Sequence, residues 1–304
     1  MSISQTRVFP APRSLFSVPL PDGRTLELGR RTLVMAILNV TPDSFAEAGR
    51  HRDPDTAIAD ALRFADEGAA VVDIGGESTR PGAPPVDAEE EWRRIAPVLE
   101  GLRGRITVPI SVDTYKASVA ERALALGATL VNDVSGLTRE PALAGVVART
   151  GAAVVLMHSR GPSADMYAAA AYARVVEDVR TELADRDRAA REAGIAPERI
   201  ILDPGLGFAK RAEHTWAVLA GLPRLSTLGR PLLSGPSRKS FLKTAIGDRP
   251  PNERVWATAA AVTASVLLGA HIVRVHDVAA MVDVVRAADE VIRRPGLVVQ
   301  DPVS

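Results

Sequence analysis

Beyond residue 30, the hydrophobic residues of this chain gather into eight short runs separated by longer amphipathic segments. Each run is rich in Val, Ile or Leu, and apolar and polar positions do not alternate cleanly within it. Such uniform runs are typical of parallel strands that are buried on both faces. The eight predicted strands span residues 33–40, 71–75, 106–112, 130–134, 153–157, 200–202, 231–234 and 271–275.

The segments between these runs carry the signals of helices. Asp53 precedes a proline, which places an N-cap residue before a proline at the first helical position. Asp87 stands three residues before Glu90, a capping-box pattern, and apolar residues follow at helical spacing. Residues 177–193 predict a long charged helix that Gly194 ends. We therefore expect strands and helices to alternate along the chain.

Eight strands that alternate with helices predict an α/β fold, a single closed (β/α)8 TIM barrel. An open doubly wound sheet is the alternative, but no G-x-G-x-x-G sequence follows the first strand. A turn signal at residues 20–24, between short apolar runs, predicts an N-terminal β-hairpin that plugs one end of the barrel. The expected organisation is a hairpin extension in residues 1–30, the barrel in 31–296 and a tail in 297–304.

The C-terminal ends of the strands form the active site in such barrels, and here every predicted strand ends in polar residues. Buried charges are costly unless they are paired or bind a ligand, so their convergence predicts an enzyme. Asp113, Asn132 and Asp203 would enter the barrel mouth from three strands. A carboxylate accepts two adjacent N–H groups, and an amide both donates and accepts, which suits a heterocycle with an amino-amidine edge. Lys239 could face a ring carbonyl or nitrogen of the same ligand.

A second part of the barrel mouth favours an anion. Arg274 and His276 lie two residues apart on the last strand and so share a face. Together with the Gly- and Ser-rich loop after the seventh strand, they predict a phosphate site, where barrels often place one. Asn39, at the end of the first strand, could offer a neutral oxygen to a hard cation such as Mg²⁺.

Composition narrows the classes of function. The 304 residues include 37 Lys+Arg and 37 Asp+Glu, and this zero net charge removes the basic footprint of a nucleic-acid-binding protein. Cysteine is absent, which excludes disulfides, cysteine–zinc sites and a thiolate nucleophile. Residues 1–20 lack the apolar core of a secretory signal, so we expect a cytoplasmic protein. The uncharged stretch 255–270 is too short and too rich in Thr, Ser and Ala to span a membrane, and it predicts core packing or a subunit interface.

Seven strand-end motifs, in this order, closely resemble dihydropteroate synthase of the pterin-binding enzyme family. The resemblance covers about residues 33–294. Each motif alone is moderately specific, and the ordered set is very specific. The motifs are Asn39-Val-Thr-Pro-Asp-Ser-Phe45, Gly75-Gly-Glu-Ser-Thr-Arg-Pro-Gly82, Ser111-Val-Asp-Thr114, Asn132-Asp-Val-Ser-Gly136, Asp203-Pro-Gly205, Ser237-Arg-Lys-Ser-Phe241 and Arg274-Val-His-Asp277.

This resemblance implies the reaction and its partners. The diphosphate ester of 6-hydroxymethyl-7,8-dihydropterin would react with p-aminobenzoate to give 7,8-dihydropteroate and pyrophosphate, a step of folate biosynthesis. The transfer would be SN1-like and assisted by Mg²⁺. The family is usually homodimeric through its late helices, so a homodimer is expected, and sulfonamide-type inhibitors are expected to compete with p-aminobenzoate.

The resemblance also implies which residues form the site. The pterin would be held by Asp113, Asn132, Asp203, Lys239 and Phe208. The diphosphate would be bound by Asn39, Arg274 and His276. The p-aminobenzoate pocket would comprise Phe45, Thr79, Arg80, Pro81 and Ser240. Catalysis would depend on Lys239, Asp113 and Arg274, and Mg²⁺ would be bound by Asn39, with Glu47 as a further candidate ligand.

The first loop departs from the family pattern, which commonly has Ser-Asp-Gly-Gly after the phenylalanine. Ala46-Glu47-Ala48-Gly49 stands there in this chain, so the carboxylate is one methylene longer. This change keeps open a non-catalytic paralogue that binds pterin without making product. A corrinoid-dependent methyltetrahydrofolate methyltransferase shares the pterin barrel, but it would not need the motif at 237–240 or the loop at 79–81.

Simpler interpretations remain for single residues. Asp113 or Asp203 could cap the following helix, since Asp is a favoured N-cap residue. Asn39 could satisfy backbone groups at a strand end. His276 could be a buried structural histidine, and a structural role is the favoured interpretation of His158. Asp73 is not among the residues assigned to a substrate. It either orders the loop that follows it or lies near the metal.

Overall fold

A computed structural model of the chain describes residues 13–41, 53–78, 82–161, 167 and 170–294. Its main feature is a sheet of eight parallel strands with the order β8-β7-β6-β5-β4-β3-β10-β9. A parallel bridge between Leu202 and Leu232 joins β8 to the residue before β9, and so the ring closes. The strands are β3 (Leu33–Asn39), β4 (Val71–Gly75), β5 (Ile110–Asp113), β6 (Leu130–Asp133), β7 (Ala153–Met157), β8 (Ile200–Asp203), β9 (Leu233–Ser234) and β10 (Ile272–Val275).

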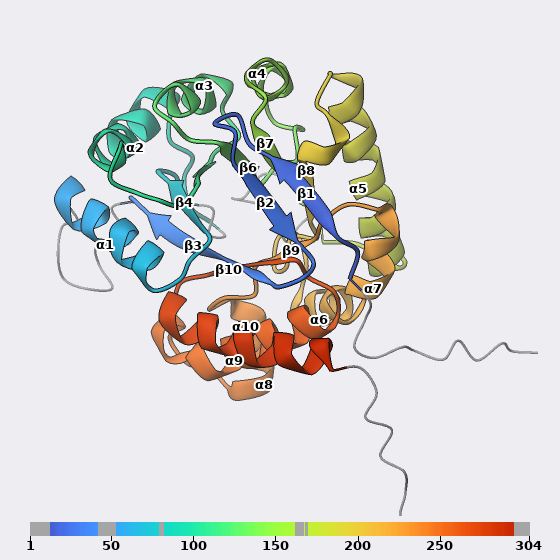
Figure 1. Ribbon diagram of the computed structural model, residues 1–304. Coiled ribbons are helices and arrows are strands. Elements are labelled where there is room, and N and C mark those ends of the chain that lie inside the picture. Colours follow the sequence, from blue (N-terminus) through green and yellow to red (C-terminus); the bar gives the residue numbers. More distant parts are fainter. Residues whose placement is uncertain (1–12, 42–52, 79–81, 162–166, 168–169, 295–304) are drawn as a thin grey trace, which may run out of the picture.

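Helices surround this ring, as Figure 1 shows. The caps predicted from sequence are present: Asp53 accepts a bond from the backbone N of Thr56 (2.7 Å), and Asp87 accepts one from that of Glu90 (2.8 Å). The α-helices are α1 (Pro54–Asp66), α2 (Ala88–Leu102), α3 (Ala117–Ala125), α4 (Ala142–Thr150), α5 (Val175–Glu192), α6 (Ala212–Ala220), α7 (Leu222–Leu225), α8 (Lys243–Ile246), α9 (Val255–Leu267) and α10 (Val278–Arg293). Short 3-10 helices are η3 (Pro197–Arg199), η4 (Ser226–Leu228), η5 (Ser240–Leu242) and η6 (Pro251–Glu253). The structure is thus the predicted (β/α)8 barrel.

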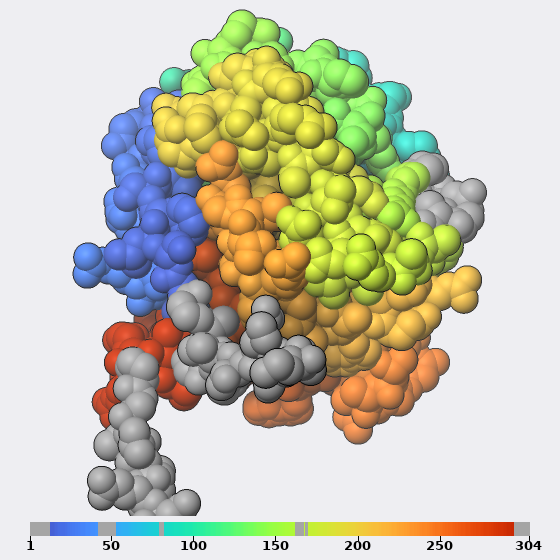
Figure 2. Space-filling view, turned by 90° about the vertical axis from the view of Figure 1, so that its right-hand side faces the viewer, coloured from blue at the N-terminus to red at the C-terminus, as the bar shows by residue number. Residues whose placement is uncertain are grey.

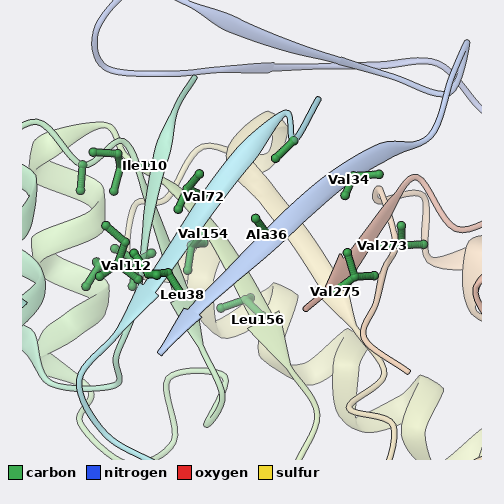
Figure 3. Close-up of a cluster of buried hydrophobic side chains, with 14 of the residues drawn as sticks. Val34, Ala36, Leu38, Val72, Ile110, Val112, Val154, Leu156, Val273 and Val275 are labelled. Carbon is green, nitrogen blue, oxygen red and sulfur yellow. The ribbon is translucent and has the colours of Figure 1, made fainter. Parts of the chain in front are cut away.

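Two apolar layers explain why the strands read as uniform hydrophobic runs. Alternate strand residues face outward and pack against the helices, among them Val34, Ala36 and Leu38 of β3 (Figure 3). The residues between them face the barrel axis, and in most strands those nearest the start are also apolar. Polar residues that face the axis, such as Asp73 and Asp113, lie above this apolar layer, toward the C-terminal ends of the strands.

The predicted N-terminal hairpin consists of β1 (Phe16–Pro19) and β2 (Thr25–Leu28), paired antiparallel. Its buried residues belong to the same cluster as the inward-facing residues near the starts of the barrel strands. The hairpin lies across this end of the ring in Figure 1, and it appears in blue at one side of the molecule in Figure 2. In the described part of the chain, the hairpin therefore closes the end of the barrel where the strands begin, and a cavity opens at the end where they finish. The hairpin residues that contribute to this plug are Val18, Leu20, Leu26 and Leu28.

Three predicted boundaries differ from the structure by two residues or more, and several others by one residue. The third strand begins at Ile110 rather than residue 106, because Ile106 still bonds through its backbone N to Leu102 at the end of α2. The seventh strand is only two residues long, since Pro231 and Pro236 near its ends have no N–H to donate. The long charged helix begins two residues earlier than predicted, at Val175. No helix among the described residues is long and apolar enough to cross a membrane.

A buried ion pair connects the N-terminal segment to the last helix. Arg13 Nη2 lies 2.6 Å from Asp289 Oδ1, and both side chains are at most 3% exposed. Asp289 Oδ2 also accepts a bond from the backbone N of Thr32 (2.7 Å). Substitution Asp289→Ala would leave the guanidinium buried without its carboxylate. We expect the free energy of unfolding to fall by about 3–5 kcal/mol, the usual cost of breaking a buried pair.

Urea denaturation of the Asp289→Ala variant measures this loss. Asp283→Ala is the matched control, because Asp283 is on the same helix and its side chain is 82% exposed. The control should change stability by no more than about 0.5 kcal/mol, as surface substitutions usually do. Equal losses in the two variants would contradict the importance of the buried pair.

Candidate functional site

A cavity of about 910 Å³ opens at the C-terminal ends of the strands. Its walls bring together most of the described residues that the sequence analysis assigned to the site. They come from β3, β6, β8 and β10 and from the segments that follow β8, β9 and β10. These residues are Asn39, Asn132, Asp203, Phe208, Lys239, Ser240, Arg274 and His276. A pocket this large suits a small organic ligand.

Arg274 links two carboxylates beneath this cavity. Its Nε donates to Asp73 Oδ2 (2.6 Å), and its Nη2 donates to Asp113 Oδ2 (2.7 Å). Burial alone would lower the pKa of the guanidinium, but the charges of Asp73 and Asp113 raise it above its ordinary value. Arg274 is therefore held in a fixed orientation as a cation at the edge of the cavity.

Asp113 lies behind the cavity wall rather than within it. Its Oδ1 is buried and has no hydrogen-bond partner among the described residues. Burial raises the pKa of Asp113 to about 8, against the charge of Arg274, and the nearby charge of Asp73 adds to the rise. A buried acceptor without a partner is costly, so a ligand that donates to this oxygen would be favoured.

Asp203 and Lys239 face the same cavity with opposite charges. Asp203 Oδ1 accepts a bond from the backbone N of Gly205 (2.7 Å), and burial raises the pKa of this carboxyl. Lys239 Nζ donates to the backbone O of Leu206 and lies 4.4 Å from the centroid of the Phe208 ring. Burial lowers the pKa of Lys239 to about 8, although Asp203 opposes this effect.

The turn after β9 explains how Lys239 reaches the cavity. Arg238 has a φ of 58°, a left-handed conformation that turns the chain between Ser237 and Lys239. Three contacts hold this turn. Arg238 Nη2 donates to Asp277 Oδ1 (2.6 Å), its backbone N donates to Thr258 Oγ1 (3.0 Å), and its backbone O accepts from Arg254 Nη1 (2.7 Å).

His276 and Ser237 form the corner of the cavity next to Arg274. His276 Nδ1 and Ser237 Oγ are 3.0 Å apart, and the backbone N of His276 donates to the same hydroxyl (3.2 Å). Imidazole, hydroxyl and guanidinium groups all donate hydrogen bonds to phosphate oxygens. This corner therefore has the chemistry of the predicted anion site.

A buried lysine that the sequence analysis missed supports the loop after β8. Lys210 is 1% exposed, and its Nζ donates to the backbone O of Gly205 and of Phe208 (3.0 Å each). It also lies 2.8 Å from His158 Nδ1, and His158 Nε2 lies 3.0 Å from Glu182 Oε2. Burial, reinforced by Lys210, lowers the pKa of His158 to about 3. The imidazole is thus neutral, accepts from Lys210 and donates to Glu182.

Lys210 carried no signal in the sequence, because a lysine in a polar segment usually lies at the surface. Asp73 was recognised in the sequence, but in the structure it bonds to Arg274 and Asn132. Some predicted residues lie outside the described part of the chain: Phe45, Glu47, Thr79, Arg80 and Pro81. The described residues hold no cluster of three or more His, Cys, Asp or Glu side chains arranged for a metal.

The raised pKa of Asp113 predicts how stability depends on pH. Between its ordinary value of 3.8 and about 8, folded Asp113 keeps a proton that the unfolded chain has lost. Its contribution to stability is complete at low pH and is lost as the pH rises through this range. Asn cannot titrate, so we expect the wild type to lose stability relative to Asp113→Asn between pH 5 and pH 8. Urea denaturation of both proteins at the two pH values tests this, and parallel changes would contradict it.

Comparisons with known proteins agree with this geometry. The family described as "Pterin binding enzyme" matches residues 35–276. A dihydropteroate synthase from Synechocystis is 46% identical over 275 residues, which cover 90% of this chain and 95% of that protein. A Xanthomonas albilineans dihydropteroate synthase with 4-aminobenzoic acid is 44% identical, with a TM-score of 0.84, and covers 91% of this chain and 100% of its own. A Yersinia pestis dihydropteroate synthase in a sulfonamide drug complex is 38% identical, with a TM-score of 0.86, and covers 92% and 100%.

Proposed function

We infer the roles of individual residues from the premise that this chain belongs to the pterin-binding enzyme family and catalyses the dihydropteroate synthase reaction of folate biosynthesis. The observation that carries the residue assignment is that two cations, a carboxylate and two amides converge on one cavity: Lys239, Arg274, Asp203, Asn39 and Asn132. Neither the methyltransferase nor the non-catalytic paralogue has comparable support.

Five residues are proposed to bind the pterin. In their ionised forms, Asp113 through Oδ1 and Asp203 accept hydrogen bonds from the amino and ring N–H groups, and the Asn132 amide supplies a third contact. Lys239 donates to a ring oxygen or nitrogen, while the Phe208 ring lies beside the ligand. The groups are present on rigid strand ends or a braced loop, and so they orient the pterin without rearrangement. The negative charge of Asp203 also stabilises a cationic dihydropterin as the leaving group departs.

The diphosphate is proposed to occupy the corner formed by Arg274, His276 and Ser237, next to Asn39. These groups stabilise the anion that forms when the exocyclic C–O bond breaks. The aniline nitrogen of p-aminobenzoate then forms the new C–N bond and loses a proton. It is neutral at pH 7, so the reaction needs no strong base at this step.

Mg²⁺ is proposed as the cation that accompanies the diphosphate. Asn39, whose side-chain amide carries an oxygen suited to a hard cation, lines the cavity. Mg²⁺ usually keeps several waters and takes few protein ligands besides substrate phosphate oxygens. When bound, Mg²⁺ neutralises charge on the departing diphosphate. Ser240, which also lines the cavity, is proposed to contact p-aminobenzoate, and Phe45, Thr79, Arg80 and Pro81 are proposed to complete that pocket.

A pyrophosphate-release assay tests the function. We expect release that requires the dihydropterin diphosphate, p-aminobenzoate and Mg²⁺ together. We expect a sulfonamide to compete with p-aminobenzoate but not with the dihydropterin diphosphate. No release, together with retained binding of the pterin, would support the non-catalytic paralogue instead. If pyrophosphate release and pterin binding were both absent, the assignment of the whole site would be contradicted.

A homodimer formed through the late helices is proposed from the outer face of α9. This helix has no charged residue, yet Trp256 is 82% exposed. Exposed uncharged surface of this kind commonly marks a subunit interface. We expect the wild type to sediment as a dimer and Trp256→Arg to shift it toward the monomer. Leu15→Arg is the control, since Leu15 is also an exposed apolar residue but lies near the hairpin. A monomeric wild type would contradict this proposal.

The cellular location is proposed as the cytoplasm. The chain contains no cysteine, and both proposed substrates are small polar molecules. A composition without cysteine is compatible with a reducing compartment.

A further inference from the structure

Asp73 is a buried carboxylate that bonds to two residues of the cavity wall but does not itself line the cavity. It lies in β4 and is 0% exposed. Its Oδ2 accepts a hydrogen bond from Asn132 Nδ2 (2.9 Å) and another from Arg274 Nε (2.6 Å). One oxygen atom thus connects a proposed pterin ligand on β6 with a proposed diphosphate ligand on β10.

The strand register places Asp73 one layer deeper than the ligand-facing residues. Asn39, Gly75 and Asp113 are aligned across β3, β4 and β5. Asp73 is aligned with Ile37 and Ser111, in the layer below. Since alternate residues of a strand share a face, Asp73 also points into the barrel, beneath the cavity floor. Asp73 therefore acts on a ligand through the residues that it holds, Asn132 and Arg274, and through its charge, rather than by direct contact.

The chemistry of a carboxylate decides how Asn132 is oriented. An ionised carboxylate only accepts hydrogen bonds, so the amide must turn its NH₂ group toward Asp73. This leaves Asn132 Oδ1 as the amide atom available to a ligand, and an acceptor is what an N–H group of a pterin requires. The same carboxylate fixes Arg274 through Nε, which leaves Nη2 for Asp113.

We propose that Asp73 is a positioning residue that sets the hydrogen-bond polarity of the pterin site by fixing Asn132 as an acceptor and Arg274 as its neighbouring cation. The proposal rests on the function proposed above. It predicts that Asp73 determines affinity for the pterin substrate but not for p-aminobenzoate.

Substitution Asp73→Asn tests this with little change of shape. An amide at this position removes the charge and can present either oxygen or NH₂ to Asn132, so the Asn132 amide is free to flip. We expect the KM for the dihydropterin diphosphate, and its Kd by calorimetry, to rise by about tenfold or more, as when an orienting partner is removed. The KM for p-aminobenzoate should stay within about twofold, which marks a loss confined to one substrate. Asp73→Ser is measured alongside, in case the amide variant does not fold.

A pH profile gives a second signature. Asp113 is surrounded by the charges of Arg274, Asp73, Glu91 and Asp133, and it also faces Lys239 across the cavity. The Asp73 charge raises the pKa of Asp113, so its removal should move the acid limb of pterin binding to lower pH. Asp289→Asn is the matched control, because it removes a buried carboxylate at the other end of the barrel and should leave both KM values and the profile unchanged.

A double-mutant cycle with Asn132→Ala completes the test. If Asp73 acts through Asn132, Asp73→Asn should weaken pterin binding less in the Asn132→Ala background than in the wild type. Additive losses, equal changes in both KM values, or unchanged KM values and pH profile in Asp73→Asn would each overturn the proposal. A wild-type protein without turnover or pterin binding would instead contradict the proposed function, so the two failures are distinguishable.

Discussion

Substitution Lys239→Ala is expected to lower kcat/KM by about 100- to 1000-fold, the range observed when a preorganised donor is removed from an active site. Lys239 is held by Leu206 and the Phe208 ring and faces Asp203 in the cavity. Alanine would remove the donor to the pterin ring and leave Asp203 without its neighbouring cation. We therefore expect pterin binding and turnover to be lost together.

Steady-state kinetics and calorimetric titration with the dihydropterin diphosphate measure both effects of Lys239→Ala. Lys243→Ala is the matched control, because Lys243 lies in α8, is 40% exposed and pairs with Asp248 outside the cavity. The control should retain wild-type kinetics. A Lys239→Ala variant with near-wild-type turnover would show that Lys239 is a solvated loop residue rather than part of the site.

Substitution Arg274→Met is expected to impair both stability and turnover. It leaves the buried carboxylates of Asp73 and Asp113 without their shared cation. Loss of one partner of a buried ion pair costs about 3–5 kcal/mol, and loss of a cation beside the leaving group should cost turnover about 100- to 1000-fold. The two effects are separable, because kinetics are measured well below the temperature at which the variant unfolds.

The loss of stability in Arg274→Met should depend on pH. Without the guanidinium, the pKa of Asp113 should rise further above its wild-type value of about 8, so that the folded state keeps this proton at a higher pH. The wild type stops losing stability through Asp113 near pH 8 and the variant continues to lose it, so the difference from wild type should be larger at pH 9 than at pH 7. Urea denaturation at the two values checks this. Arg286→Met, on the exposed face of α10, is the control, and a deficit independent of pH would contradict the account.

Much of the fold followed from local patterns. Strands β4 (Val71–Gly75) and β7 (Ala153–Met157) have the predicted boundaries, because each is a short apolar run, interrupted in β4 only by Asp73, between turn or helix signals. The two N-caps, Asp53 and Asp87, were recognisable because their bonds reach only three residues along the chain. The cavity was predictable for a related reason: parallel strands bring their C-terminal ends to the same end of a barrel.

The support beneath the site was not predictable from local patterns. Lys210 is held by partners far away in sequence, such as His158, so nothing nearby distinguishes it from a surface residue. Asp73 was recognised within a predicted strand, but its bonds to Asn132 and Arg274 reach across the barrel and leave no local signal. The start predicted for the third strand, residue 106, was wrong, because Ile106 and Val108 are apolar but lie between the end of α2 and the sheet. Hydrophobicity alone does not separate these two environments.

Calorimetric titration of the dihydropterin diphosphate into the wild type and Asp203→Asn most directly tests the central claim that the cavity at the strand ends is the pterin site. Asp203 lines this cavity and is 6% exposed. Its carboxylate accepts a hydrogen bond from the backbone N of Gly205 and lies near the charges of Lys239 and Lys210. The account predicts saturable binding by the wild type and affinity reduced by about tenfold or more in the variant, since a buried hydrogen-bonding partner of the ligand is lost. Equal affinity of the two proteins would contradict it.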